Sequence, residues 1–142
     1  MTFSSAGSRV RMTSGDDGFE AGMVVFDERF DASTLHLLRE RVTSCTAVAG
    51  VPEDRALDVI LAVHELAANA VRHGGGRGRL LMRAADGALH CQISDAGPDA
   101  RPWPVRQGHG LWIVRAAADE VAVSSGPRGS QVTAMFRWLP GP

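Results

Sequence analysis

The pattern of apolar and polar positions predicts a fixed order of strands and helices along the chain. Spacings of three and four residues between apolar side chains, as in residues 32–49, indicate amphipathic helices. Alternation of apolar and polar side chains, as in residues 88–95, indicates a strand with one buried face. We predict strands over residues 22–27, 78–85, 88–95, 121–125 and 131–139, and helices over residues 32–49, 53–73 and 108–118.

Turn-forming residues separate these elements. Three glycines, Gly74 to Gly76, end the second helix, and the pair Asp86–Gly87 is typical of a tight hairpin between two strands. Residues 97–107 contain three prolines and predict a loop. The order of elements favours one sheet with its helices packed on one face.

Length and composition limit the class of protein. A chain of 142 residues favours a single domain, which we place at residues 19–142, after a small and polar leader over residues 1–18 that we expect to be disordered. The net charge of −1 excludes a strongly basic nucleic-acid binder. No apolar run reaches the ~20 residues that cross a membrane. The N-terminus has no signal-peptide pattern, so we expect a cytoplasmic protein.

Cysteine and lysine usage exclude further classes. The two cysteines, Cys45 and Cys91, are too few for a disulfide scaffold, and we expect reduced thiols. All 15 basic residues are arginine, so the chain has no lysine. This excludes P-loop phosphate binding, the lysine-dependent kinases and Schiff-base catalysis.

The helix predicted over residues 53–73 carries a candidate chemical site. Glu65 and Asn69 are four residues apart, so their side chains meet on one face of the helix. A carboxylate beside a carboxamide offers oxygen ligands to Mg²⁺ and a group that accepts a proton. Taken alone, such a stripe is more typical of a solvated helix face. A zinc-protease motif at His64–Glu65 is excluded, because Ala68 stands where the second histidine is required.

Two further features point to a ligand with a flat ring and phosphates. Asp95 follows the buried face of the strand over residues 88–95, where a carboxylate needs a donor, and Gly97 leaves room for a flat ligand. An Asp95 that caps the turn and faces water is the alternative. Gly108 and Gly110 open the third helix and expose backbone N–H groups that suit phosphate, although such helix starts are common.

These segments together resemble the GHKL (Bergerat-fold) ATP-binding family. Residues 64–73 resemble its N box, residues 95–97 and 108–114 resemble its first two glycine boxes, and residues 129–132 resemble its last box. Each motif is weak alone, but the four occur in the family's order over residues 22–139. The resemblance implies a two-layer α/β (α+β) sandwich with a mixed, largely antiparallel sheet and about three helices on one face.

The resemblance also implies roles for individual residues. Asn69 would hold Mg²⁺, Glu65 would orient or deprotonate the attacking hydroxyl, and Asp95 would accept a hydrogen bond from the adenine amino group. The full set implied for ATP is Asn69, Asp95, Gly97, Arg106, Gly108, His109, Gly110, Leu111 and Ser130, with Arg101 as an alternative to Arg106.

Three departures from the family pattern concern this set. The segment expected to close over ATP, residues 98–107, is short and rich in proline. His109 stands where relatives often have arginine, and Ser130 stands where the family usually has threonine.

The lone domain is similar to the RsbW-like anti-sigma-factor serine kinases. That resemblance implies a protein that binds a sigma factor and transfers the γ-phosphate of ATP to a serine of a STAS-type antagonist, with homodimerisation and no direct contact with nucleic acid or membrane. One alternative is an ATP-dependent binding module with little or no kinase activity. The other is an α/β interaction domain without a nucleotide.

Overall fold

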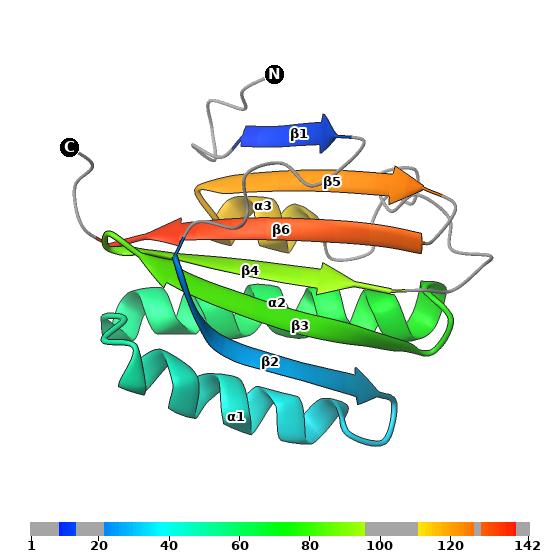
Figure 1. Ribbon diagram of the computed structural model, residues 1–142, viewed down its shortest axis with the longest axis horizontal. Coiled ribbons are helices and arrows are strands. Elements are labelled where there is room, and N and C mark those ends of the chain that lie inside the picture. The colour runs from blue at the N-terminus through cyan, green and yellow to red at the C-terminus, as the bar shows by residue number, and fades with distance from the viewer. Residues whose placement is uncertain (1–8, 14–21, 96–110, 127–128, 139–142) are drawn as a thin grey trace.

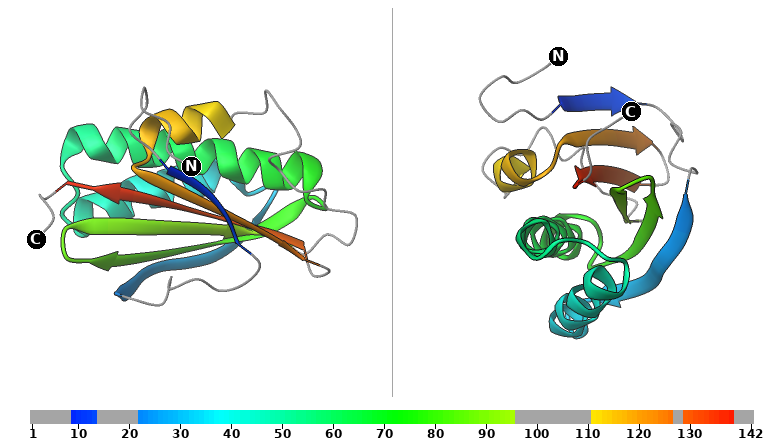
Figure 2. Two further views of the ribbon diagram at one scale, coloured as in Figure 1. Left: turned by 90° about the horizontal axis from the view of Figure 1, so that it is seen from above. Right: turned by 90° about the vertical axis from the view of Figure 1, so that its left-hand side faces the viewer.

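The computed structural model describes residues 9–13, 22–95, 111–126 and 129–138 as a two-layer α+β sandwich. The elements are β1 (Arg9–Thr13), β2 (Met23–Asp31), α1 (Leu35–Val48), α2 (Glu53–His73), β3 (Arg77–Ala85), β4 (Ala88–Ser94), α3 (Leu111–Ala117), β5 (Glu120–Gly126) and β6 (Gly129–Arg137). In Figure 1 the sheet lies in front of the three helices, and the end-on view of Figure 2 places all of them on one side of it.

One sheet contains all six described strands, in the order β1-β5-β6-β4-β3-β2. Strand β1 runs parallel to β5, whereas every other neighbouring pair is antiparallel. The mixed, largely antiparallel sheet with helices on one face confirms the expected fold class.

Strand β1 lies within the segment that we expected to be disordered. Its five residues pair in parallel with Glu120 to Ser124 of β5, so the expectation for residues 1–18 is corrected at Arg9–Thr13. The pairing satisfies backbone groups along one edge of β5. The rest of that leader lies outside the described residues.

Strand β2 continues four residues beyond the predicted strand over residues 22–27, to Asp31. Phe26 and Phe30 are four residues apart in the strand and are both buried in the core. Phe30 lies opposite Gly78 of β3, where a Cβ would come within 2.7 Å of the phenyl ring. Glycine at position 78 therefore gives Phe30 its space against the sheet.

Helix α2 is the centre of the helical layer. It begins with Glu53 and Asp54 and ends with Arg72 and His73. Acidic residues at the start and basic residues at the end interact favourably with the helix dipole. It contacts α1, α3 and strands β3, β4 and β6. Its buried residues are Val59, Ala62, Val63, Leu66, Ala67, Asn69 and Ala70. Among the described residues, no helix has the length and apolar character that crossing a membrane requires.

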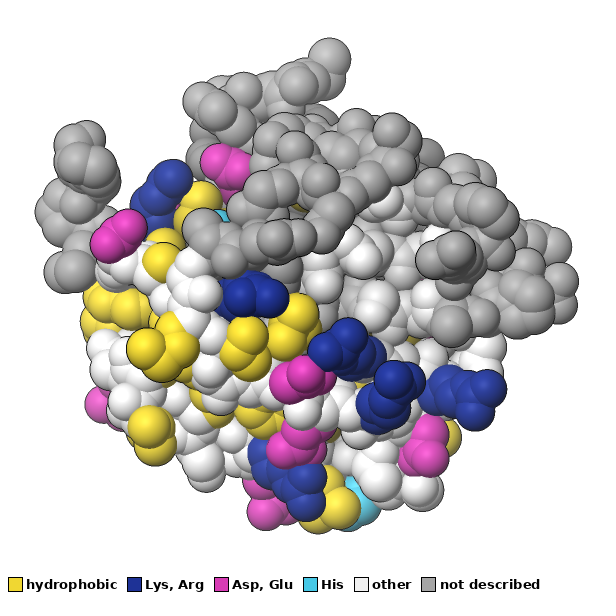
Figure 3. All heavy atoms as spheres, in the orientation of Figure 1, with side chains coloured by type: hydrophobic (Ala, Val, Ile, Leu, Met, Phe, Trp, Pro, Cys, Tyr) yellow, Lys and Arg dark blue, Asp and Glu magenta, His cyan; other side chains and the backbone are white. Residues whose placement is uncertain are grey.

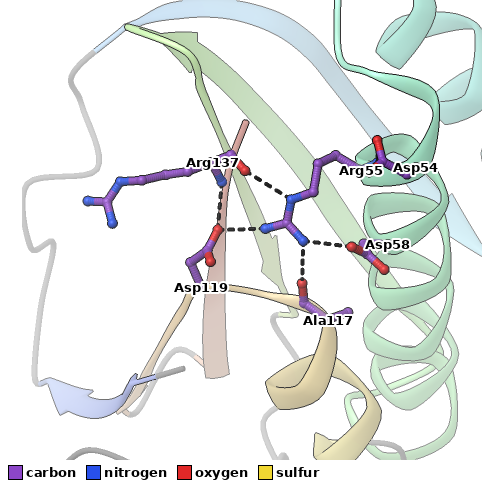
Figure 4. A network of polar contacts seen from close by, with 6 residues as sticks. All are labelled: Asp54, Arg55, Asp58, Ala117, Asp119 and Arg137. Carbon is purple, nitrogen blue, oxygen red and sulfur yellow. Dashed lines mark hydrogen bonds and ion pairs between the residues drawn. The ribbon is translucent and has the colours of Figure 1, made fainter. Parts of the chain in front are cut away.

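Arg55 connects the start of α2 to α3, to β6 and to Asp119 in the connection between α3 and β5 (Figure 4). Its guanidinium donates to Asp58 at 2.6 Å and to Asp119 at 2.5 Å. It also donates to the carbonyls of Ala117, at the end of α3, and Arg137, at the end of β6, at 3.0 and 2.9 Å. The side chain is only 20% exposed, so these contacts fix α2 and α3 against the sheet.

The face of the sheet away from the helices carries polar side chains, among them His90 of β4. His90 is half-buried, and this burial lowers the pKa of its imidazole below 6.5. The nearby charge of Glu120 opposes that shift, and Arg137 adds to it. The folded protein therefore favours neutral His90.

Replacing Arg55 should destabilise the fold more than replacing a surface arginine. We expect Arg55→Met to lower the free energy of unfolding by about 1–3 kcal/mol, because it removes charge-assisted bonds from carboxylates that are partly exposed. Urea unfolding measures this value. The control is Arg41→Met, which removes the more exposed ion pair with Glu28 and should cost less than about 1 kcal/mol. Equal losses in both variants would contradict the role of Arg55.

The shift of His90 makes stability depend on pH. Because the folded pKa is the lower one, stability is full above pH 6.5 and decreases as the pH falls through that value towards the folded pKa. We expect His90→Gln to reduce this slope in unfolding titrations at a series of pH values. An unchanged slope in His90→Gln would refute the assignment.

Candidate functional site

Asp95 lies between the end of α2 and the beginning of β6. It is 6% exposed, and its backbone N–H donates to the carbonyl of Ser130 at 3.0 Å. A Cβ added to Gly74 would lie 2.6 Å from carboxylate atom Oδ2, and one added to Gly129 would lie 3.0 Å from Oδ1. Glycine is thus required on both sides of the carboxylate, since a larger side chain would displace it.

This burial decides between the two interpretations of Asp95. The side chain follows the core-facing alternation of β4 and does not cap a turn towards water. Burial of a carboxylate is costly unless donors surround it. The buried position of Asp95 therefore favours a carboxylate that binds a ligand over one that faces water.

Ser130 lies beside Asp95, on the neighbouring strand. It is 3% exposed, and its hydroxyl oxygen has no hydrogen-bond partner among the residues that the structure describes. A buried hydroxyl without a partner costs about 1–3 kcal/mol. Such a group next to a buried carboxylate fits a ligand that has both a donor and an acceptor along one edge, as a purine has.

Glu65 and Asn69 lie one turn apart on α2. Glu65 is half-buried and Asn69 is 4% exposed, so the solvated-face interpretation is wrong for Asn69. Helix position 69 is also poorly suited to asparagine on propensity alone. Helix α2 therefore carries a buried carboxamide and a half-buried carboxylate one turn apart.

Arg72 joins this group; the sequence places it within the segment that resembles the N box, but it was not among the predicted site residues. Its Nη2 donates to Asn69 Oδ1 over 3.5 Å, a long bond, and its Nε donates to the carbonyl of Ala68 at 3.4 Å. The i, i+3 spacing from Asn69 was the available signal. Arg72 is an exposed cation within reach of an anionic ligand held near Asn69.

The protein oxygens at this place suit a cation only if a ligand brings further oxygens. Among the described residues, no group of three or more His, Cys, Asp or Glu side chains is arranged to hold a metal. Asn69 and Glu65 supply one amide oxygen and one carboxylate. Mg²⁺ is commonly held by one or two protein groups together with phosphate oxygens and water, so these residues fit a nucleotide-bound Mg²⁺.

Part of the predicted set lies outside the described residues. Gly97, Arg101, Arg106, Gly108, His109 and Gly110 belong to this part, as does the predicted closing segment over residues 98–107. Leu111 is the first residue of α3. The structure thus brings Asp95 and Ser130 together and places Glu65 and Asn69 one turn apart on α2, while the phosphate-binding glycines stay a prediction.

Comparison with known proteins agrees with this geometry at the level of the family. A search of curated proteins found no match. Residues 29–136 match the family model of the histidine kinase-like ATPase domain, which implies ATP binding. The match includes Glu65, Asn69, Asp95 and Ser130 and covers more than half of the 142 residues. The chain therefore belongs to the family of histidine kinase-like ATPase domains.

Proposed function

We propose that the chain is an ATP-dependent anti-sigma factor that phosphorylates a serine of its antagonist protein. The observation that carries the nucleotide part is the buried pair of Asp95 and Ser130 at adjacent strand ends. The family match supports it, since it spans both residues. The kinase and anti-sigma parts rest on the resemblance and on Glu65.

Asp95 and Ser130 would read the adenine ring. The carboxylate accepts a hydrogen bond from the amino group of adenine, and a bond to a buried charged acceptor is stronger than a neutral one. The hydroxyl of Ser130 gains the partner that it lacks among the described residues. Gly97 would leave space for the ring to lie against the backbone.

The phosphates would extend from this pocket towards α2. Asn69 would hold the Mg²⁺ that bridges the phosphates, and Arg72, already in contact with Asn69, would neutralise phosphate charge together with Arg106 or Arg101. Gly108 and Gly110 would donate backbone N–H groups, with His109 and Leu111 beside them. Transfer between oxygens depends mainly on such positioning and charge neutralisation.

Glu65 would serve the transfer step. A half-buried carboxylate one turn from the metal-holding residue can orient the serine hydroxyl or accept its proton. The phosphate would add about −2 charge to the antagonist and weaken its docking. The sigma factor and the STAS-type antagonist would be the partners of a cytoplasmic protein, which would act as a homodimer.

One observation favours a second candidate, an ATP-dependent binding module without kinase activity. Arg72 already donates to the Asn69 oxygen that would ligate Mg²⁺. If this contact persists with ATP bound, the metal is held poorly and transfer is slow. The two candidates differ in the role of Glu65. A kinase requires it for phosphate transfer, whereas a binding module does not.

Removing the charge of Asp95 should weaken ATP binding. We expect Asp95→Asn to raise the dissociation constant by roughly 10- to 150-fold, equivalent to about 1.5–3 kcal/mol for a lost charge-assisted bond. Calorimetric titration with Mg–ATP measures it. The control is Asp27→Asn, at an exposed position of β2, which should bind as the wild type does. Equal affinity in Asp95→Asn, with its unfolding midpoint unchanged, would exclude the adenine assignment.

Replacing Glu65 should separate binding from transfer. We expect Glu65→Gln to keep its affinity for ATP and to lose about 10²- to 10⁴-fold in phosphate transfer, the range for removal of a general base. Transfer is followed with γ-labelled ATP and a purified STAS-domain antagonist. The control is Glu53→Gln at the exposed start of the same helix. Unchanged transfer would refute the role of Glu65, and ATP binding without transfer in the wild type would favour the binding module.

A further inference from the structure

Three exposed arginines gather on the face of the sheet away from the helices. Arg29 of β2 lies opposite Arg79 of β3, and Arg77 lies one pleat further along β3. In Figure 3, dark blue side chains gather at the right-hand end of this face, where β2 ends and β3 begins. Like charges directly opposite each other destabilise a strand pair. The register also places Asp31 opposite Arg77, so cross-strand charge pairing accounts for Arg77 but not for the placement of Arg29 opposite Arg79.

The acidic groups of the same region leave two of the guanidinium groups unmatched. Arg79 binds Asp27 through two bonds of 2.8 and 2.7 Å, and these bonds lower the pKa of Asp27, with a smaller contribution from the charge of Arg29. Asp31 accepts bonds from the backbone N–H groups of Ser33 and Thr34 and from the Ser33 hydroxyl. Arg29 and Arg77 make no ion pair within the described part of the chain.

A cavity of about 630 Å³ lies beside these arginines. Arg29, Arg77 and Arg79 line it, together with Ser94, Phe30 and Asp95. We call this place the arginine hollow. Its three guanidinium groups lie beside two carboxylates: Asp31, whose Oδ1 accepts bonds from its own turn, and the buried Asp95.

We propose that the arginine hollow docks a short acidic segment of a partner protein in extended conformation. Arg77 and Arg79 are two residues apart in one strand, a separation of about 6.6 Å, and alternate carboxylates of an extended segment have the same separation. Arginine binds carboxylates through paired N–H groups, and Arg29 and Arg77 have no ion pair with any residue that the structure describes.

The charges around the hollow favour a protein segment over a nucleic acid. Asp27 and Asp31 lie on the same face and would repel a long polyanion beyond its first few charges. The net charge of −1 gives the chain no general attraction for nucleic acid. A segment with two or three acidic residues matches the local charge.

The proposed function requires a protein partner, and the arginine hollow would bind an acidic segment of such a partner. Only the biological role of this docking rests on the proposed function. The docking test contains no nucleotide. Failure of acidic peptide binding would therefore leave the ATP assignment intact. Failure of ATP binding would leave the docking proposal for the arginine hollow intact.

Peptide titration followed by amide NMR shifts tests the proposal. The probe is the peptide Glu-Ser-Glu-Ser-Glu, with Gln-Ser-Gln-Ser-Gln as the uncharged control. We expect saturable shifts at residues 29–31 and 77–79 with the acidic peptide alone, and weaker binding when the salt is raised from 50 to 300 mM.

The double variant Arg29→Ser/Arg77→Ser should weaken binding at least tenfold. The variant Arg77→Ser should weaken it more than Arg39→Ser, which changes an exposed arginine of α1.

Three results would overturn the proposal. One is an absence of saturable shifts in the wild type, and another is equal binding by the wild type and the double variant. The third is tighter binding of a short single-stranded RNA of ten uridines at the same residues, which would assign the hollow to nucleic acid. The variants change exposed side chains, and their unfolding midpoints should equal that of the wild type.

Discussion

The close packing of Asp95 between Gly74 and Gly129 is the constraint on which the site depends. It brings the end of α2, the end of β4 and the start of β6 to one place, and it leaves no room for a Cβ on either glycine. The hydrogen bond from the Asp95 N–H to Ser130 closes the same corner. Because Gly74 and Gly129 pack directly against Asp95, the backbone on both sides limits where its carboxylate can lie.

Helix α2 is fixed at both of its ends. At its start, Arg55 connects it through charge-assisted bonds to α3, to β6 and to Asp119, which precedes β5. Its last turn leads into Gly74 and so into the corner at Asp95. Glu65 and Asn69 lie between these two anchors, on a helix that has little freedom to shift along the sheet. This rigidity is what an acid and an amide that act together require.

The sequence predicted the elements whose signal is local. The helix over residues 53–73 was predicted correctly at both ends, because Pro52 precedes it and three glycines follow it. Strand β1 was missed, since its pairing with β5 connects segments that are more than a hundred residues apart. The contacts of Arg55 join positions separated by up to 82 residues, and no periodicity reveals them. The burial of Asn69 and the contact from Arg72 depend equally on how α2 is rotated against the sheet.

The two faces of the sheet serve different chemistry in this account. The helical side holds the buried acid, hydroxyl and amide that suit a nucleotide, while the open side carries arginines that suit an acidic partner. The arginine hollow reaches the edge of the helical side, because Asp95, the residue that we propose reads adenine, also lines it. A crystal structure of the chain with a non-hydrolysable ATP analogue and Mg²⁺ tests the central claim most directly. The account predicts the amino group of adenine at hydrogen-bond distance from the Asp95 carboxylate, and a purine bound elsewhere, or no bound analogue, would contradict it.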